Sequence, residues 1–190
     1  MRWFYENAFN VVWFAWVTWW VVAAVGAKAT IRRESVASRV LHITPLLLGI
    51  ALFESPRLAG GWLTMRYLSQ TRATFFTGLI LTLLGLGFSV LARARLGRNW
   101  SGTVTLKQDH ELIRAGPYRW VRHPIYTGLL AAVLGSAIAL GEWRGLVALA
   151  LITVSLLRKI QVEERFLTER FGAAYTRYQA EVPALVPGLF

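Results

Sequence analysis

The sequence predicts an all-α, polytopic membrane protein of about five transmembrane helices, with a cytoplasmic loop and a C-terminal helix attached to them. Hydrophobic residues make up 55% of its 190 residues, and its mean hydropathy is positive, as is typical of membrane proteins. The apolar residues fall in long runs, and the 21 Lys and Arg residues are gathered between those runs. These features together predict helices that cross a bilayer and basic loops that stay on one side of it.

Residues 1–94 contain three apolar runs, which we expect to form an N-terminal membrane region. Residues 8–26 would extend roughly 28 Å as a helix, and no small-residue cleavage pattern follows them, so we expect a retained span. Residues 40–53 are shorter and contain His42 and Pro45. They form either a kinked span that borrows flanking residues or a re-entrant segment.

The third run, residues 75–94, is long enough for a complete span. Its glycines, Gly78, Gly85 and Gly87, are expected to allow close packing against another helix more than contact with a cofactor. His42, in the second run, is expected to hydrogen-bond to a neighbouring helix.

Residues 95–190 form the second predicted region. Two short apolar runs, residues 125–140 and 143–157, are separated by Gly141 and Glu142, a spacing that indicates a helical hairpin. The loop at residues 95–123 and the tail after Leu157 are too polar to lie in lipid. Apolar residues recur at helical spacing over residues 161–178, so the tail should be a helix that ends by Pro183.

The charges predict an orientation in the membrane. With five spans, sixteen of the basic residues fall on one side and five on the other. Because cytoplasmic loops retain Lys and Arg, the N-terminus should lie outside and the C-terminus in the cytoplasm. The short chain favours a prokaryotic inner membrane protein. The net charge of +11 sits between apolar runs and not on a soluble face, which argues against nucleic acid as a partner.

Two clusters of residues are candidates for a functional site. Residues 110–128 place two His, two Tyr, a Trp and several Arg in a loop that leads into a span. The loop is either a binding surface or an interfacial belt in which aromatic rings and Arg meet lipid headgroups. The second cluster is Lys159, Glu163 and Glu164, on one helix face, which is either a solvated ion pair or a ligand site. No Cys is present and no His or carboxylate pair has metal-ligand spacing, so we expect no metal.

Residues 99–190 resemble the integral membrane methyltransferases typified by isoprenylcysteine carboxyl methyltransferase, which include the phospholipid N-methyltransferases. Residues 116–128 read Gly-Pro-Tyr-Arg-Trp-Val-Arg-His-Pro-Ile-Tyr-Thr-Gly. They are followed, in order, by Glu163-Glu164, Phe171-Gly172, Tyr175, Tyr178 and Val182-Pro183. The ordered set is specific, although each piece alone is weak.

The resemblance implies that the loop and the tail fold together over a methyl donor, S-adenosylmethionine, which leaves as S-adenosylhomocysteine. It assigns the acceptor to Lys159 and Glu163 as catalytic residues. It assigns the donor to His110, Glu111, Leu112, Ile113, Tyr118, His123, Pro124, Ile125, Tyr126 and Glu164.

The acceptor is expected to be lipophilic, either an isoprenylcysteine-type carboxylate or a phospholipid amine. Lys159 stands where the eukaryotic enzymes carry Arg, and Thr103 stands where they carry Gln. Lys can neutralise a carboxylate but cannot hold it in bidentate fashion. An amine would need to lose a proton, with Glu163 as the candidate base. Two other functions stay open: a membrane sterol or enone reductase that uses NADPH, and a non-catalytic scaffold that holds anionic lipid.

Overall fold

The computed structural model describes residues 2–25, 30–97, 100, 105–107 and 112–188. Four of its helices are long and apolar enough to cross a membrane: α1 (Arg2–Ala24), α2 (Val36–Glu54), α4 (Arg72–Leu96) and α6 (Trp143–Phe171). A fifth apolar helix, α5 (Pro124–Leu140), has 17 residues and a length of roughly 25 Å at about 1.5 Å per residue. The prediction of an all-α, multi-pass membrane protein is therefore confirmed.

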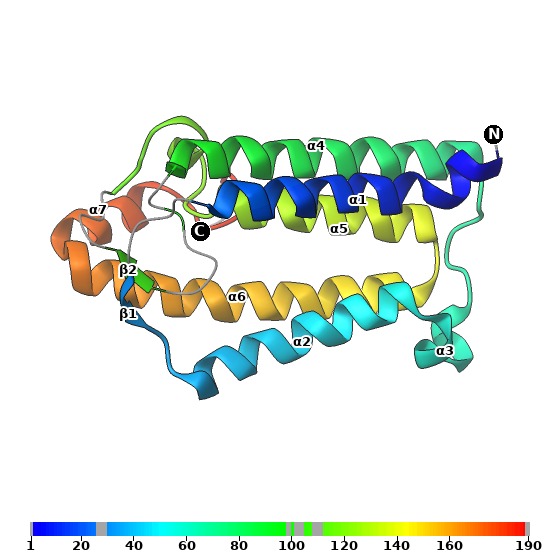
Figure 1. Cartoon of the computed structure of the whole chain (residues 1–190), viewed down its shortest axis with the longest axis horizontal. Helices are drawn as coiled ribbons and strands as arrows, with labels where there is room; N and C mark the ends of the chain where they lie inside the picture. Colours follow the sequence, from blue (N-terminus) through cyan, green and yellow to red (C-terminus); the bar gives the residue numbers. More distant parts are fainter. Residues whose placement is uncertain (1, 26–29, 98–99, 101–104, 108–111, 189–190) are drawn as a thin grey trace.

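Shorter elements join these helices. At one end of the bundle lie α3 (Pro56–Ala59) and the 3-10 helix η1 (Gly61–Thr64); at the other lie the 3-10 helix η3 (Gly116–Arg119) and α7 (Ala173–Glu181). The strands β1 (Thr30–Arg33) and β2 (Thr105–Lys107) pair antiparallel, with Thr30 opposite Lys107. The sequence did not predict this small sheet. Figure 1 shows α4, α1 and α5 along one side of the molecule, with α6 and α2 along the other.

Helices α4 and α5 pack closely because glycines face backbone. A Cβ added at Gly85 would lie 2.4 Å from the carbonyl oxygen of Gly128, and one added at Gly78 would lie 2.4 Å from that of Gly135. Neither distance leaves room for a methyl group. Gly87, in contrast, faces open space. The expected packing role is thus confirmed for two of the three glycines of this span.

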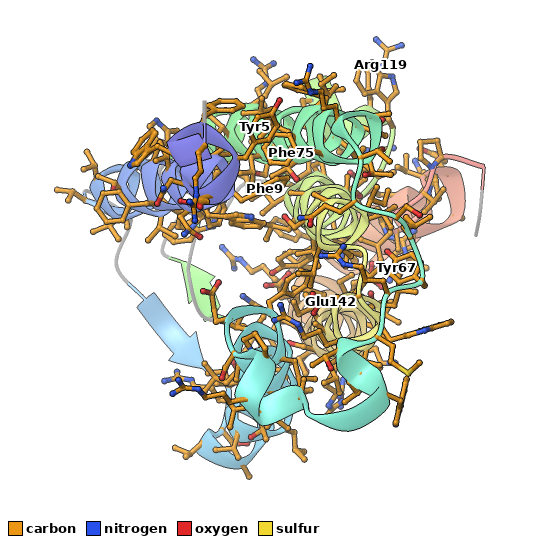
Figure 2. All side chains as sticks on the ribbon, turned by 90° about the vertical axis from the view of Figure 1, so that its right-hand side faces the viewer. Tyr5, Phe9, Tyr67, Phe75, Arg119 and Glu142 are labelled. Carbon is orange, nitrogen blue, oxygen red and sulfur yellow. The ribbon has the colours of Figure 1, made fainter. Side chains whose placement is uncertain are left out.

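Helix α1 is joined to the bundle by its aromatic side chains. Tyr5 and Phe9 pack on Phe75 of α4, with ring centroids 4.8 and 5.6 Å apart (Figure 2). Further along α1, the indole of Trp13 donates to Ser136 at 3.1 Å, and that of Trp16 donates to Ser89 at 2.9 Å. These bonds give the partly buried indole N–H groups partners. The opposite side of α1 exposes large apolar residues, as a lipid-facing surface requires.

Helix α2 is continuous through Pro45 and runs beside α6, so residues 40–53 belong to a helix of spanning length and not to a short re-entrant segment. At its end, Arg144 of α6 is buried and donates to the carbonyl oxygens of Leu52 and Phe53 and to Glu142. Tyr67 donates to Ala137 O at 3.0 Å, and Figure 2 shows Tyr67 and Glu142 at this same end. This end of the bundle is closed by hydrogen bonds.

The predicted hairpin is present, but the predicted tail helix begins in the wrong place. Helix α6 continues past Leu157 without interruption to Phe171, and the chain then breaks at Gly172, where φ is +54°, before α7 begins. Residues 161–178 are therefore the end of the last span helix plus a second short helix. The polar composition after Leu157 marks where the apolar part of the helix ends, and does not mark a helix boundary.

Candidate functional site

A cavity of about 650 Å³ lies between α1, α2, α5, α6 and α7, within the range of roughly 300–1,000 Å³ that small-molecule sites occupy. Its lining changes character along the helices. Towards the ends of α2 and α6 that lie near α7 it is polar, with Glu34, His42, Lys159 and Glu163. Towards the middle of the bundle it is apolar, and includes Trp13, Leu46, Ile50, Val133 and Ile152. The cavity therefore suits a ligand, or a pair of ligands, with polar and apolar parts.

The imidazole of His123 lies between two carboxylates at the edge of this cavity. Its Nε2 is 3.0 Å from Glu164 Oε1, and its Nδ1 is 3.6 Å from Glu163 Oε2. His123 is buried, at the N-terminal end of α5, and both glutamates come from α6. Since a carboxylate accepts, Nε2 carries the proton that it donates to Glu164. The loop and the start of the tail therefore meet at this residue.

Glu164 holds the loop and the tail together. Arg122 donates through Nε to Glu164 Oε1 at 2.8 Å, and Gln179 of α7 donates to Oε2 at 3.0 Å. Arg122 also donates to the carbonyl oxygens of Gln179 and Val182. Together with His123, these groups give the Glu164 carboxylate three hydrogen-bond donors. Glu164 therefore connects the loop, α6 and α7.

Tyr126 and Glu163 form the wall of the cavity next to His123. The hydroxyl of Tyr126 donates to Glu163 Oε1 at 2.5 Å, and its ring stacks on the His123 ring with centroids 5.7 Å apart. Lys159 Nζ lies 5.4 Å from the centroid of the same ring, at a distance typical of a cation–π contact. Tyr126 of α5 thus contacts both the carboxylate of Glu163 and the ammonium of Lys159 on α6.

Three tyrosines near η3 and α7 complete the polar end. Burial raises the pKa of Tyr118 and of Tyr175 well above the usual range, and raises the pKa of Tyr178 to about 12. All three phenols therefore stay neutral near pH 7. Tyr178 donates to the carbonyl oxygen of Tyr118. Tyr118 and Tyr175 are among the residues that line the cavity. Their hydroxyls are buried and have no hydrogen-bond partner within the described part of the chain.

The structure brings most of the candidate residues from the sequence to this cavity. Pro124 is buried as the first residue of α5, and neither it nor Glu164 is among the lining residues. His110, Glu111 and Thr103 lie outside the described residues. Arg119, between the candidate positions, points away from the bundle (Figure 2). The candidates that line the cavity are Leu112, Ile113, Tyr118, His123, Ile125, Tyr126, Lys159 and Glu163.

Sequence reasoning missed the contribution of the N-terminal helices to the lining. His42 was expected to hydrogen-bond to a neighbouring helix. Its ring Nε2 instead lies 3.6 Å from Glu34, a residue just before the start of α2. The bond to the neighbouring helix is made by the backbone oxygen of His42, which accepts from Ser155 of α6. The only sequence signal for this contribution was the acidic residue Glu34 beside a basic loop. The missed residues are Trp13, Trp16, Trp20, Glu34, Arg39, His42, Ile43, Leu46 and Ile50.

Comparison with known proteins gives consistent matches. The family model for phospholipid methyltransferases matches residues 73–174, more than half of the chain. Protein-S-isoprenylcysteine O-methyltransferase of Saccharomyces cerevisiae is 31% identical over 124 residues, which cover 64% of this chain and 52% of the yeast protein. The cobalt-zinc-cadmium resistance protein CzcN of Cupriavidus metallidurans is 32% identical over 124 residues, covering 64% and 55%.

A solved structure, that of the eukaryotic intramembrane Ras methyltransferase ICMT, matches with a TM-score of 0.52 and 26% identity. The match covers 82% of this chain and 54% of that one, so the likeness in fold extends beyond the C-terminal half in which the sequence resemblance was found. The chain spans about half the length of the curated relatives it matches.

Proposed function

The chain belongs to the phospholipid methyltransferase family, and on that premise we propose that it is an integral membrane enzyme that methylates a lipophilic acceptor with S-adenosylmethionine. The observation that supports this most is the single cavity on which His123, Tyr126, Lys159 and Glu163 converge. It joins a polar end to an apolar wall, as a reaction between a water-soluble donor and a lipid-embedded acceptor requires.

The donor fits the polar end of the cavity by the chemistry of the groups there. When bound, S-adenosylmethionine supplies a methyl group on a positively charged sulfur. Tyr118 and Tyr175 carry buried hydroxyls that lack partners among the residues described, and the rings of Tyr118 and Tyr126 offer faces that favour a cation by about 0.5–2 kcal/mol each when water is excluded. The other residues assigned to the donor are His110, Glu111, Leu112, Ile113, His123, Pro124, Ile125 and Glu164.

Lys159 and Glu163 are the proposed catalytic residues because they are charged groups of the polar end and stand on α6, the helix that also carries Ile152 of the apolar lining. Lys159 orients an acceptor that is a carboxylate, which is already nucleophilic near pH 7. Glu163 takes the proton from an acceptor that is an amine. Tyr126 and His123 fix the position of the Glu163 carboxylate, so that acceptor and donor are held in line, which is the main requirement of a displacement at a methyl carbon.

The proposed orientation places the polar end of the cavity at the cytoplasmic face of a prokaryotic inner membrane. The basic residues of the loop and the tail gather there. The cavity then receives the donor from the cytoplasm and a prenylated or other lipid acceptor from the bilayer. No nucleic acid takes part.

A labelling experiment tests this function. Detergent-purified protein is incubated with S-adenosylmethionine carrying a radiolabelled methyl group and with a total lipid extract, and the organic phase is counted. We expect label in a lipid fraction, dependent on the protein and suppressed by S-adenosylhomocysteine. Label that stays in the aqueous phase with every extract, while added NADPH is oxidised, would indicate a reductase instead.

A further inference from the structure

A buried arginine lies where α1 and α4 end. Arg93, in the last turn of α4, is 4% exposed, and Figure 1 shows the C-terminal ends of α1 and α4 at the same end of the bundle. A charged residue inside a membrane-spanning helix is costly, and such residues commonly pair with backbone carbonyls and mark functional regions. Arg93 has no part in the mechanism above and therefore needs a role of its own.

The guanidinium of Arg93 holds the ends of both helices. Its Nη1 donates to the carbonyl oxygen of Gly97, the C-cap residue of α4, at 2.7 Å. Its Nη2 donates to the carbonyl oxygen of Ala23, in the last turn of α1, at 2.5 Å. The C-terminal end of a helix carries unpaired carbonyls and a partial negative charge. Arg93 thus joins α1 to α4 at the end of the bundle where the cavity is polar.

The same guanidinium stacks on a residue of the cavity lining. Its Cζ lies 4.2 Å from the centroid of the Trp100 ring, which is a close cation–π contact. The Trp100 ring in turn meets that of Trp20 on α1 edge-on, with centroids 5.5 Å apart and planes at 86°. Both tryptophans line the cavity, and Arg93 is not among the lining residues. Arg93 therefore lies behind a pair of tryptophans that it holds in place.

The tryptophan pair packs with residues assigned to the methyl donor. Trp20 and Trp100 pack against a buried cluster that contains Tyr118 and Ile125, and both of these are donor residues in the function proposed above. Trp20 lies on α1, outside residues 73–174, which carry the family match. The family match therefore does not account for this part of the donor's surroundings.

We propose that Arg93 is a positioning residue, which holds Trp20 and Trp100 as one wall of the donor pocket and so makes α1 part of that pocket. The donor pocket is that of the function proposed above, on which this inference rests. Aromatic faces suit both the flat purine and the sulfonium of the donor. A lysine at this position would keep the charge, but it lacks the planar fork that reaches two carbonyls while its face stays against a ring.

Arg93→Lys tests the positioning role because it keeps the charge and removes the fork. The affinity of the detergent-purified protein for S-adenosylhomocysteine is measured by calorimetry. We expect its Kd to rise roughly three- to thirtyfold, the range over which residues without ligand contact alter binding. Arg72→Lys, at an exposed arginine that begins α4, is the matched control and should bind as the wild type does. Wild-type affinity in Arg93→Lys would overturn the proposal.

A double variant separates positioning from a general loss of stability. Trp100→Leu should weaken the binding of S-adenosylhomocysteine by itself. If Arg93 acts through Trp100, the loss of affinity in the double variant should be smaller than the product of the two single losses. Losses that multiply in full would show that Arg93 does not act through the tryptophan wall, and would overturn the proposal.

Variants of α1 keep the test decisive even if Arg93→Lys fails to fold. Trp20→Leu should weaken the binding of S-adenosylhomocysteine, whereas Trp19→Leu, at a neighbour that is not among the lining residues, should bind as the wild type does. Equal affinity in these two variants would overturn the claim that α1 is part of the donor pocket. Failure of the wild type itself to bind S-adenosylhomocysteine would overturn the proposed function before any variant is compared.

Discussion

Replacing Glu163 with Gln should lower the methyl-transfer rate by about 100-fold or more, the range that positioned acid–base groups contribute, while changing the affinity for S-adenosylhomocysteine little. The amide keeps an oxygen that can accept from Tyr126, so the cavity wall keeps its shape. What is lost is the negative charge beside His123 and Lys159. The measurement is kcat with the lipid fraction labelled by the wild type, together with calorimetric binding of S-adenosylhomocysteine.

Two companion variants separate charge from position. Tyr126→Phe removes the hydroxyl that orients Glu163 but keeps the charge and the ring, so it should reduce kcat less than Glu163→Gln does. Glu169→Gln, an exposed glutamate further along α6, should turn over at the wild-type rate. Wild-type kcat in Glu163→Gln would mean that the acceptor is not bound at this carboxylate.

Replacing Glu164 with Ala should destabilise the protein and weaken donor binding together. The variant leaves Arg122, whose side chain is 12% exposed, without its carboxylate partner, and removes the acceptor of His123 and Gln179. Breaking one side of such a buried pair costs about 3 kcal/mol, or roughly 6–12 °C in Tm for a chain of this size. Because the contacts of Glu164 position His123 and Tyr126, the affinity of the variant for S-adenosylhomocysteine should fall by about tenfold or more.

The neighbouring variant Arg165→Ala is the control for this effect. Arg165 is exposed and donates only within its own helix, to Gln161 O at 3.4 Å, among the bonds that the structure describes. Its Tm and its affinity for S-adenosylhomocysteine should match the wild type. Equal Tm in Glu164→Ala and Arg165→Ala would show that the contacts among loop, α6 and α7 do not stabilise the fold.

The C-terminal half could be predicted well because its signals are local. Pro124 begins α5, Gly141 separates the arms of the hairpin, and Glu163 and Glu164 are adjacent in the sequence and flank His123 in space. The membrane fold followed from the length and spacing of apolar runs, which need no knowledge of tertiary contacts. The orientation across the membrane and the roles of individual site residues stay predictions.

The part of the cavity formed by α1 and α2 could not be predicted, because it depends on contacts between distant residues. The bond from Trp16 to Ser89 joins positions 73 residues apart, and Glu34 reaches the cavity only because α2 packs on α6. The end of α6 was misplaced for a different reason. A helix can leave the membrane without breaking, and hydropathy reports the membrane boundary and not the helix boundary.

The proposed function requires that the segment around Tyr118 and His123 closes with α6 on a cavity that holds the methyl donor. This requirement can be tested by calorimetric titration of the detergent-purified wild type with S-adenosylhomocysteine. We expect saturable binding that S-adenosylmethionine competes away and that His123→Ala, still folded by its Tm, loses. No heat of binding with either compound, or binding of NADPH in their place, would contradict it.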